Sequence, residues 1–219
     1  MLGAPRAPVN NRAASMAEDA DRQVELIEKT TAYKGWAKVD RYRLRHSLYR
    51  GGMSGPVERE LFERGHAVAV LLYDPAADAL VLVEQFRVGA FAAGQPAWLV
   101  ETVAGIIDEG EAPAEVAARE CREETGLEAR DIFHVCDYLP SPGGCSEVIS
   151  FHCGRVDSRG AGGVHGLAEE HEDIRVLVVP AAEAVAWLDG GQIRNAVTLV
   201  ALHWFARNRD RLRERWAGS

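Results

Sequence analysis

The stretch GIIDEGEAPAEVAARECREETGL, residues 105–127, predicts one short acidic helix between two loops. Pro113 suits the first turn of a helix, and Gly126 suits the position just after its end. At about 100° per residue, one side of this helix carries small and apolar residues that can face a core. That predicted core face consists of Ala114, Ala117, Ala118, Cys121 and Thr125.

Acidic side chains crowd the end of the predicted helix, on the face next to the predicted core face. Glu120 and Glu124 form a like-charged pair four residues apart, which costs about 0.2–0.5 kcal/mol. Glu123 and Glu124 also occupy the last turn, where the helix dipole opposes negative charge by about 0.3–1 kcal/mol. The ordinary explanation of such a charge run is a solvated polar face. A hard divalent cation explains it better, since that ion requires several anionic oxygen ligands.

The spacing of these residues resembles the Nudix box. Gly105 is followed after five residues by Glu111 and, after seven more, by the run REC-REETG at residues 119–126, in which Cys121 takes an apolar position. The resemblance implies a loop–helix–loop that binds Mg²⁺, with Mn²⁺ as a substitute, and whose two glycines shape the loops. It also implies a hydrolase that cleaves a nucleoside diphosphate linked to another moiety.

The resemblance assigns roles to individual residues of the box. The implied metal ligands are Glu120, Glu124 and the backbone carbonyl of Ala104. Glu123 would assist in catalysis, and Arg119 would orient the glutamates through a salt bridge. Divalent cations suit such a reaction because they neutralise phosphate oxygens and lower the pKa of a bound water. A further carboxylate can then accept the proton of that water.

The segments around the box predict an α+β fold of the α/β/α sandwich kind. Residues 66–88 contain two apolar runs around DPAAD, which predicts a hairpin. Further apolar runs predict strands. Two segments predict helices: residues 180–191 end in a pair of glycines, and residues 195–216 repeat apolar residues at helical spacing. Strands with a few separate helices indicate a mixed sheet with helices on the outside. The predicted strands cover residues 97–107, 132–139, 148–156 and 174–180, and the predicted helices cover 180–191 and 195–216.

The N-terminal part predicts three antiparallel strands, at residues 24–33, 36–48 and 57–65, with GGMSGP as a turn between the last two. Three strands alone cannot make a good core, so they should pack on the main domain or on a partner chain. The predicted organisation is therefore a disordered tail at 1–20, an N-terminal β region at 21–62 and a Nudix domain at 63–219. The resemblance implies that the β region forms a homodimer.

The sequence from Tyr33 to Trp216 resembles the ADP-ribose pyrophosphatase subfamily. YLPSPGGCSE places Pro142 sixteen residues after Gly126, where that subfamily carries a proline. The alternative for this segment is an ordinary turn. The runs EQFR, VERE, LVETVAG and GVHGLAEEHEDIRV add to the match. The resemblance implies a substrate site formed by Trp36, Arg59, Arg87, Pro142, Gly143 and Glu147, with Glu101 as a further candidate.

Each of these substrate contacts has a simpler alternative. Trp36 would stack on the adenine, which is chemically sensible for an aromatic ring, but it could equally be a buried interface residue. The planar guanidinium groups of Arg59 and Arg87 suit phosphate or ribose oxygens, but strand surfaces also carry arginines. Glu101 and Glu147 could be ordinary polar residues of a strand or turn.

A second acidic segment, GRVDSRGAGGVHGLAEEHED at residues 154–173, is too long for a simple connection and predicts a functional loop. Its glycines would let Glu169, Glu170 or Glu172 move towards the metal. By resemblance, Glu170 is the expected catalytic base and Glu172 a further metal ligand. The alternative is a solvated acidic loop.

The bulk composition excludes several classes of protein. The net charge is −8 and no basic stripe occurs, which argues against nucleic-acid binding. The four cysteines have no CxxC spacing, which favours reduced thiols over a disulfide frame or a zinc site. The sequence contains no run of about 18 apolar residues that would indicate a membrane segment, so a cytoplasmic protein is expected.

The predicted activity is metal-dependent hydrolysis of ADP-ribose to AMP and ribose 5-phosphate. A pyrophosphatase for another nucleotide sugar such as GDP-mannose is the alternative within the enzyme class. A non-catalytic sensor with a Nudix fold is the alternative from a different class. Such sensors usually carry a degraded box, whereas every box position is present here.

Overall fold

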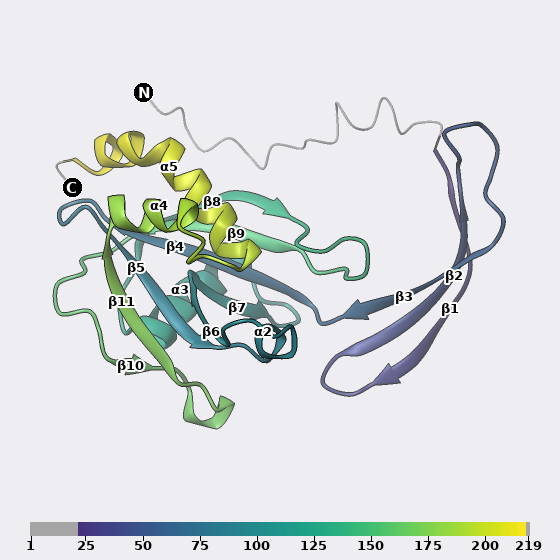
Figure 1. Ribbon diagram of the computed structural model, residues 1–219, viewed down its shortest axis with the longest axis horizontal. Helices are drawn as coiled ribbons and strands as arrows, with labels where there is room; N and C mark the ends of the chain where they lie inside the picture. The colour runs from purple at the N-terminus through teal and green to yellow at the C-terminus, as the bar shows by residue number, and fades with distance from the viewer. Residues whose placement is uncertain (1–21, 218–219) are drawn as a thin grey trace. The chain divides into compact units, whose positions relative to one another are not determined.

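The computed structural model describes residues 22–217, so the predicted tail at residues 1–20 lies outside the described residues. The described chain divides into two compact units (Figure 1). The first runs up to Arg64 and includes Ser141–Ser146, and the second comprises Gly65–Pro140 and the chain from Glu147 onward. The division predicted from the sequence lay at residue 62 and did not include the 141–146 segment.

The first unit contains the three predicted antiparallel strands, β1 (Val24–Lys34), β2 (Lys38–His46) and β3 (Val57–Glu63), in the order β1-β2-β3. Every residue of β1 is exposed. The buried residues of this unit, among those described, are Ala37, Asp40 and Ser54. The unit therefore has no apolar core of its own.

The second unit is built on an eight-stranded mixed sheet with the main order β10-β11-β5-β4-β9-β8 (Figure 1). Strands β4 and β5 form the predicted hairpin. Strands β4 and β9 run parallel, and the other neighbouring pairs are antiparallel. These strands are β4 (His66–Asp74), β5 (Ala79–Phe86), β8 (Arg130–Tyr138), β9 (Ile149–Arg155), β10 (Val164–His165) and β11 (Ile174–Pro180).

The strand predicted at residues 97–107 is two strands, because the chain changes partner at Thr102. Before it, β6 (Trp98–Glu101) pairs with β5, and after it, β7 (Val103–Ile107) pairs with β4. The Thr102 N–H donates to the buried Thr198 hydroxyl at 3.0 Å. Only β7 leads directly into the acidic helix.

Helices cover both faces of this sheet, as the sandwich prediction requires. The acidic helix α3 (Pro113–Thr125) lies on one face, and α4 (Ala181–Asp189) and α5 (Ala196–Trp216) lie on the other (Figure 1). Strand β4 shows the alternation behind this arrangement: Leu71 and Tyr73 pack on the α4–α5 side, whereas Val70 and Leu72 pack on the α3 side. A short helix, α2 (Val88–Ala92), follows β5. No helix in residues 22–217 is both long and apolar enough to cross a membrane.

Candidate active site

The acidic helix begins and ends where the sequence predicts. Pro113 is its first residue and the extended Ala112 is its N-cap. Gly126 follows the helix in the left-handed conformation, with φ at 68°, and its N–H donates to the Arg122 carbonyl at 2.8 Å. A glycine adopts this conformation without the steric cost that an L side chain would meet.

The buried face of α3 differs from the predicted core face. Ala114 is exposed, Ala118 is half-buried and Val116 is buried. Glu120 and Glu124 also face inward, with exposed fractions of 9% and 2%. The helical pattern placed both glutamates on the face next to the core face, and the structure buries that face as well, because it packs against β7.

Space for one of these carboxyl groups comes from Gly105. This residue lies within strand β7 rather than in a loop, which corrects the expectation that it shapes a loop. A Cβ atom at position 105 would lie 2.5 Å from Glu120 Cγ and closer still to the carboxyl group. The missing side chain of Gly105 therefore lets Glu120 lie against the strand.

The second buried carboxylate contacts the same strand. The Ala104 N–H donates to Glu124 Oε2 at 3.2 Å. The three residues expected to hold the metal from the box, Ala104, Glu120 and Glu124, thus lie together where α3 packs on β7.

Burial of these two carboxylates changes their acidity. Burial raises the pKa of Glu120 from 4.5 to about 7, while Arg119 lowers it and the charges of Glu123 and Glu172 raise it. Burial also raises the pKa of Glu124 well above its ordinary value. The hydrogen bond from the Ala104 N–H lowers this pKa, and the charges of Glu120 and Glu172 raise it further. Neighbouring buried carboxylates disfavour each other's ionised form, and a bound cation would remove that penalty.

The donor set suits a hard divalent cation, since it offers several anionic oxygens and a backbone carbonyl on one surface. The side chains are not drawn together as they would be around an ion. Within residues 22–217, no group of three or more His, Cys, Asp or Glu side chains has that arrangement. Glu120 instead pairs with Arg119.

Arg119 connects the carboxylates of the box. Its Nη1 donates to Glu120 Oε1 at 2.8 Å and to Glu123 Oε2 at 2.9 Å. Its Nη2 donates to Glu111 Oε2 at 3.4 Å, and the same oxygen accepts the Asp108 N–H at 3.0 Å. Arg119 therefore ties the loop before α3 to the acidic face. The sequence had assigned no contact to Glu111, because helical spacing does not extend into that loop.

The acidic loop after β9 brings one further carboxylate to this cluster. Glu172 is half-buried, its Oε2 accepts the Leu167 N–H at 3.0 Å, and its charge acts on both Glu120 and Glu124. Glu169 and Glu170 are exposed on a single 3-10 turn, η1 (Ala168–Glu170). Of the three loop glutamates expected to act, Glu172 is the one whose charge reaches the buried pair.

Arg87 lies at the edge of the same cluster. Its Nε and Nη2 donate to Glu101 Oε2 at 2.9 and 2.7 Å, and Glu101 is only 8% exposed. Burial works to lower the pKa of Arg87, but the charges of Glu101, Glu124 and Glu172 outweigh it, so the pKa is raised. Glu101 thus holds a cationic guanidinium beside the carboxylates.

The other expected substrate residues are distributed over both units. Glu147 belongs to the second unit with the carboxylates, whereas Trp36, Arg59, Pro142 and Gly143 belong to the first. Trp36 is 79% exposed, and the Arg64 guanidinium lies 5.8 Å from its ring centroid. Arg59 is exposed and donates to the Glu58 carbonyl at 2.7 Å. Neither unit alone contains the whole predicted set.

The sandwich fold and the carboxylate helix define a hydrolase domain, and comparison with known proteins identifies its class. The NUDIX domain model matches residues 63–200, and the chain belongs to the Nudix family. Nudix hydrolases act on pyrophosphate bonds and generally use divalent cations such as Mg²⁺.

Individual relatives narrow the comparison. The chain is 46% identical over 194 residues to an ADP-ribose pyrophosphatase of Escherichia coli K12, covering 89% of this chain and 93% of the relative. It is 40% identical over 203 residues to an ADP-ribose pyrophosphatase of Haemophilus influenzae, covering 91% and 94%. It is 30% identical over 195 residues to a GDP-mannose pyrophosphatase of Pectobacterium atrosepticum, covering 84% and 97%.

Proposed function

We propose that this protein hydrolyses the diphosphate bond of ADP-ribose to AMP and ribose 5-phosphate. The main support for this type of reaction is the buried pair of carboxylates, Glu120 and Glu124. The charge of Glu172 acts on both of them, and the charge of Glu124 acts on Arg87. The substrate is supported by the relatives at 46% and 40% identity, both of which are ADP-ribose pyrophosphatases.

The proposed metal site consists of Glu120, Glu124, Glu172 and the carbonyl of Ala104, for Mg²⁺ or Mn²⁺. A cation bound there would neutralise the diphosphate and lower the pKa of a water. Arg119 donates to the carboxylates of both Glu120 and Glu123 and is proposed to orient them.

The remaining catalytic steps fall to groups outside this metal site. Glu170, on an exposed turn, is the proposed base that accepts the proton of the water. Arg87 is held by Glu101 through its Nε and Nη2, so its Nη1 donors are left for a phosphate oxygen.

The first unit carries further proposed substrate contacts and the proposed dimer surface. The exposed ring of Trp36 suits stacking on adenine, and Arg59, Pro142, Gly143 and Glu147 are the other proposed contacts. The sheet of β1–β3 has no apolar core and exposes Val24, Leu26 and Tyr33. A second copy of the chain would cover such a surface. A monomer in sedimentation at micromolar concentration would contradict the homodimer.

Two alternatives remain distinct from this proposal. GDP-mannose hydrolysis has support from the relative at 30% identity, which is weaker than the support for ADP-ribose. A sensor without turnover would usually carry a degraded box, whereas every box position is present here. A cytoplasmic location is part of the proposal, because the spacing of the four cysteines favours reduced thiols.

The test is product analysis on ADP-ribose, ADP-glucose, GDP-mannose, NADH and ATP, each with and without Mg²⁺. We expect Mg²⁺-dependent release of AMP from ADP-ribose, with kcat/KM well above the other substrates. Glu124→Gln should abolish it, and Glu128→Gln, an exposed glutamate just beyond the helix, should not. A preference for GDP-mannose would overturn the substrate assignment, and no turnover on any substrate would favour the sensor.

A further inference from the structure

The glycine-rich part of the acidic loop contacts the C-terminal end of α3 at two points. The Gly166 N–H donates to the Glu123 carbonyl at 3.2 Å, which gives that carbonyl at the helix end a hydrogen-bond partner. The imidazole of His165 lies over Gly126: a Cβ atom at position 126 would be 2.8 Å from His165 Cε1. Gly126 therefore serves the helix end and also leaves room for this ring.

His165 is held from other directions as well. It pairs with Ile174 in the short β10–β11 ladder, so its backbone is part of the sheet. Its Nε2 lies 2.9 Å from the Gly162 carbonyl, and a carbonyl can only accept, so Nε2 carries the proton in this contact. The ring is thus fixed between the loop and the end of the metal-binding helix.

The chain directly after His165 reaches the loop carboxylate. Gly166 has φ at 100°, and a Cβ atom there would lie 2.6 Å from Glu172 Cβ. The next N–H, from Leu167, donates to the Glu172 carboxylate, and the Glu172 N–H donates back to the Leu167 carbonyl at 3.2 Å. Residues 165–167 therefore connect α3 on one side with Glu172 on the other.

We propose that His165 is a positioning residue that holds Glu172 against Glu120 and Glu124 by fixing the loop to the end of α3. This inference rests on the metal-dependent function proposed above and adds a residue that contacts neither metal nor substrate. Because His165 acts through Glu172, its removal should weaken cation binding without changing how Arg87 contacts a substrate.

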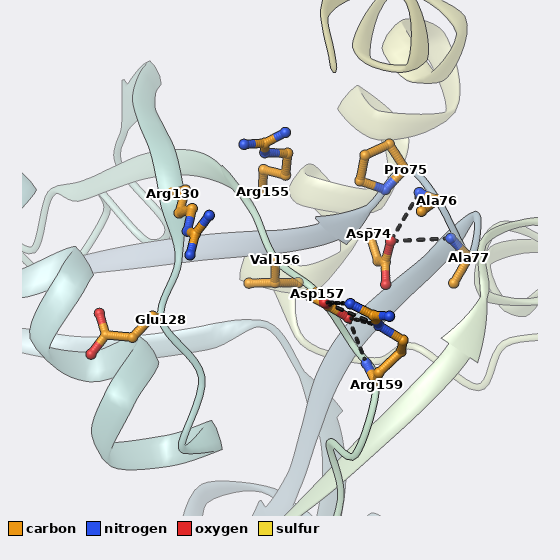
Figure 2. Close-up of a pocket in the computed structure, with 10 residues that line it drawn as sticks. All are labelled: Asp74, Pro75, Ala76, Ala77, Glu128, Arg130, Arg155, Val156, Asp157 and Arg159. Atoms are coloured by element: carbon orange, nitrogen blue, oxygen red, sulfur yellow. Dashed lines mark hydrogen bonds and ion pairs between the residues drawn. The ribbon is translucent and has the colours of Figure 1, made fainter. Parts of the chain in front are cut away.

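The start of the same loop is fixed elsewhere, which provides a matched control. Asp74 Oδ2 accepts the Ser158 N–H at 2.8 Å and its hydroxyl at 2.7 Å. Asp74 lines a cavity of about 700 Å³ together with Asp157 and Arg159, whose side chains pair with each other (Figure 2). Ser158 therefore anchors the start of the loop to Asp74, at the end of β4, rather than to α3.

The experiment measures Mn²⁺ binding by electron paramagnetic resonance, in which free Mn²⁺ gives the signal, on the full chain without substrate. Loss of a residue that orients a metal ligand typically weakens metal binding by about 10–100-fold. We therefore expect His165→Ala to weaken Mn²⁺ binding at least tenfold. His165→Gln, which keeps a donor for the Gly162 carbonyl, should recover most of the affinity. Ser158→Ala should lower the Tm and leave Mn²⁺ affinity unchanged.

A double-mutant comparison separates positioning from general damage. In a Glu172→Gln background, His165→Ala should have no further effect on Mn²⁺ affinity, because the carboxylate that it positions is already lost. Equal weakening in both backgrounds, or wild-type affinity in a folded His165→Ala protein, would overturn the proposal. If His165→Ala does not fold, His165→Leu retains the bulk and serves the same comparison. If the wild-type protein binds Mn²⁺ but does not hydrolyse ADP-ribose, the proposed function is contradicted, whereas this inference is not affected.

Discussion

The side chain of Glu120 occupies the space that any side chain at position 105 would need. Gly105 lies on β7 and Glu120 on α3, and the two residues meet where the helix packs on the strand. This contact allows a carboxylate to be buried beside Glu124, whose own oxygen accepts the Ala104 N–H. A buried pair of carboxylates is costly in a protein without a cation, so the contact indicates a site selected for binding rather than for stability.

Gly105→Ala tests this contact directly. The added methyl group overlaps Glu120, so either the carboxylate or the helix must move. We expect kcat for ADP-ribose to fall by at least about 10²-fold, since a small misplacement of catalytic groups has effects of that size. Gly89→Ala is the control, because a Cβ at Gly89 meets nothing within 4 Å. Steady-state kinetics at saturating Mg²⁺ would measure both variants, and near-normal kcat in Gly105→Ala would contradict this account.

Glu170→Gln tests the assignment of the base. Loss of a positioned general base typically costs 10²–10⁴-fold, so we expect kcat to fall by at least about 10²-fold with little change in Mg²⁺ requirement. Glu169→Gln is the matched control, since Glu169 lies on the same exposed turn. If the two variants exchange these results, the base is Glu169, and if neither loses activity, the role belongs to another carboxylate such as Glu172.

The sequence predicts the ends of α3 well because Pro113 and Gly126 act locally, through a fixed φ and a left-handed conformation. The hairpin of β4 and β5 was also predicted from a local signal, the DPAAD segment between two apolar runs. What periodicity could not predict is the inward orientation of Glu120 and Glu124, because a missing side chain on another strand makes it possible. The contact of His165 with Gly126 was missed because the two residues are distant along the chain. The contacts of Glu111 with Asp108 and Arg119 are local, but they form in the loop before the helix, where helical spacing makes no prediction.

The pH dependence of stability provides a third prediction. Glu120 has a pKa of about 7 in the folded protein and about 4.5 when unfolded, so between these pH values only the folded state retains the proton. Stability therefore falls as pH rises from about 4.5 to 7, and Glu124 adds to the effect in the same direction. In EDTA, we expect the Tm of the wild type to fall over this range more steeply than that of Glu120→Gln.

Mg²⁺ should reverse this destabilisation, because cation binding favours the ionised carboxylates. The increase in Tm on adding Mg²⁺ should therefore be larger at pH 7.5 than at pH 5.5. Calorimetry at both pH values would measure it. An equal increase at both pH values, or parallel Tm curves for wild type and Glu120→Gln in EDTA, would show that Glu120 does not titrate in this range.

The pair of Arg87 and Glu101 yields a fourth prediction, on substrate affinity. A hydrogen bond to a charged group contributes about 1.5–3 kcal/mol, so Arg87→Ala should raise KM for ADP-ribose by roughly 10–100-fold. Glu101→Gln should raise KM by less, because it leaves Arg87 in place but less firmly held. Arg175→Ala is the control, since Arg175 pairs with Glu84 on the strand surface. An unchanged KM for Arg87→Ala would make Arg87 an ordinary surface arginine.

Trp36 carries the last prediction, which concerns recognition of the adenine. With Ca²⁺ in place of Mg²⁺, under conditions where no product forms, ADP-ribose should quench or shift the fluorescence of this exposed ring by stacking on it. Trp36→Leu should abolish that change and raise KM for ADP-ribose, with a smaller effect on kcat. Trp98→Leu is the matched control, because Trp98 is a second exposed tryptophan, at 64%, on the other unit. If the signal survives in Trp36→Leu and is lost in Trp98→Leu, the base stacks on the second unit and the role assigned to Trp36 is wrong.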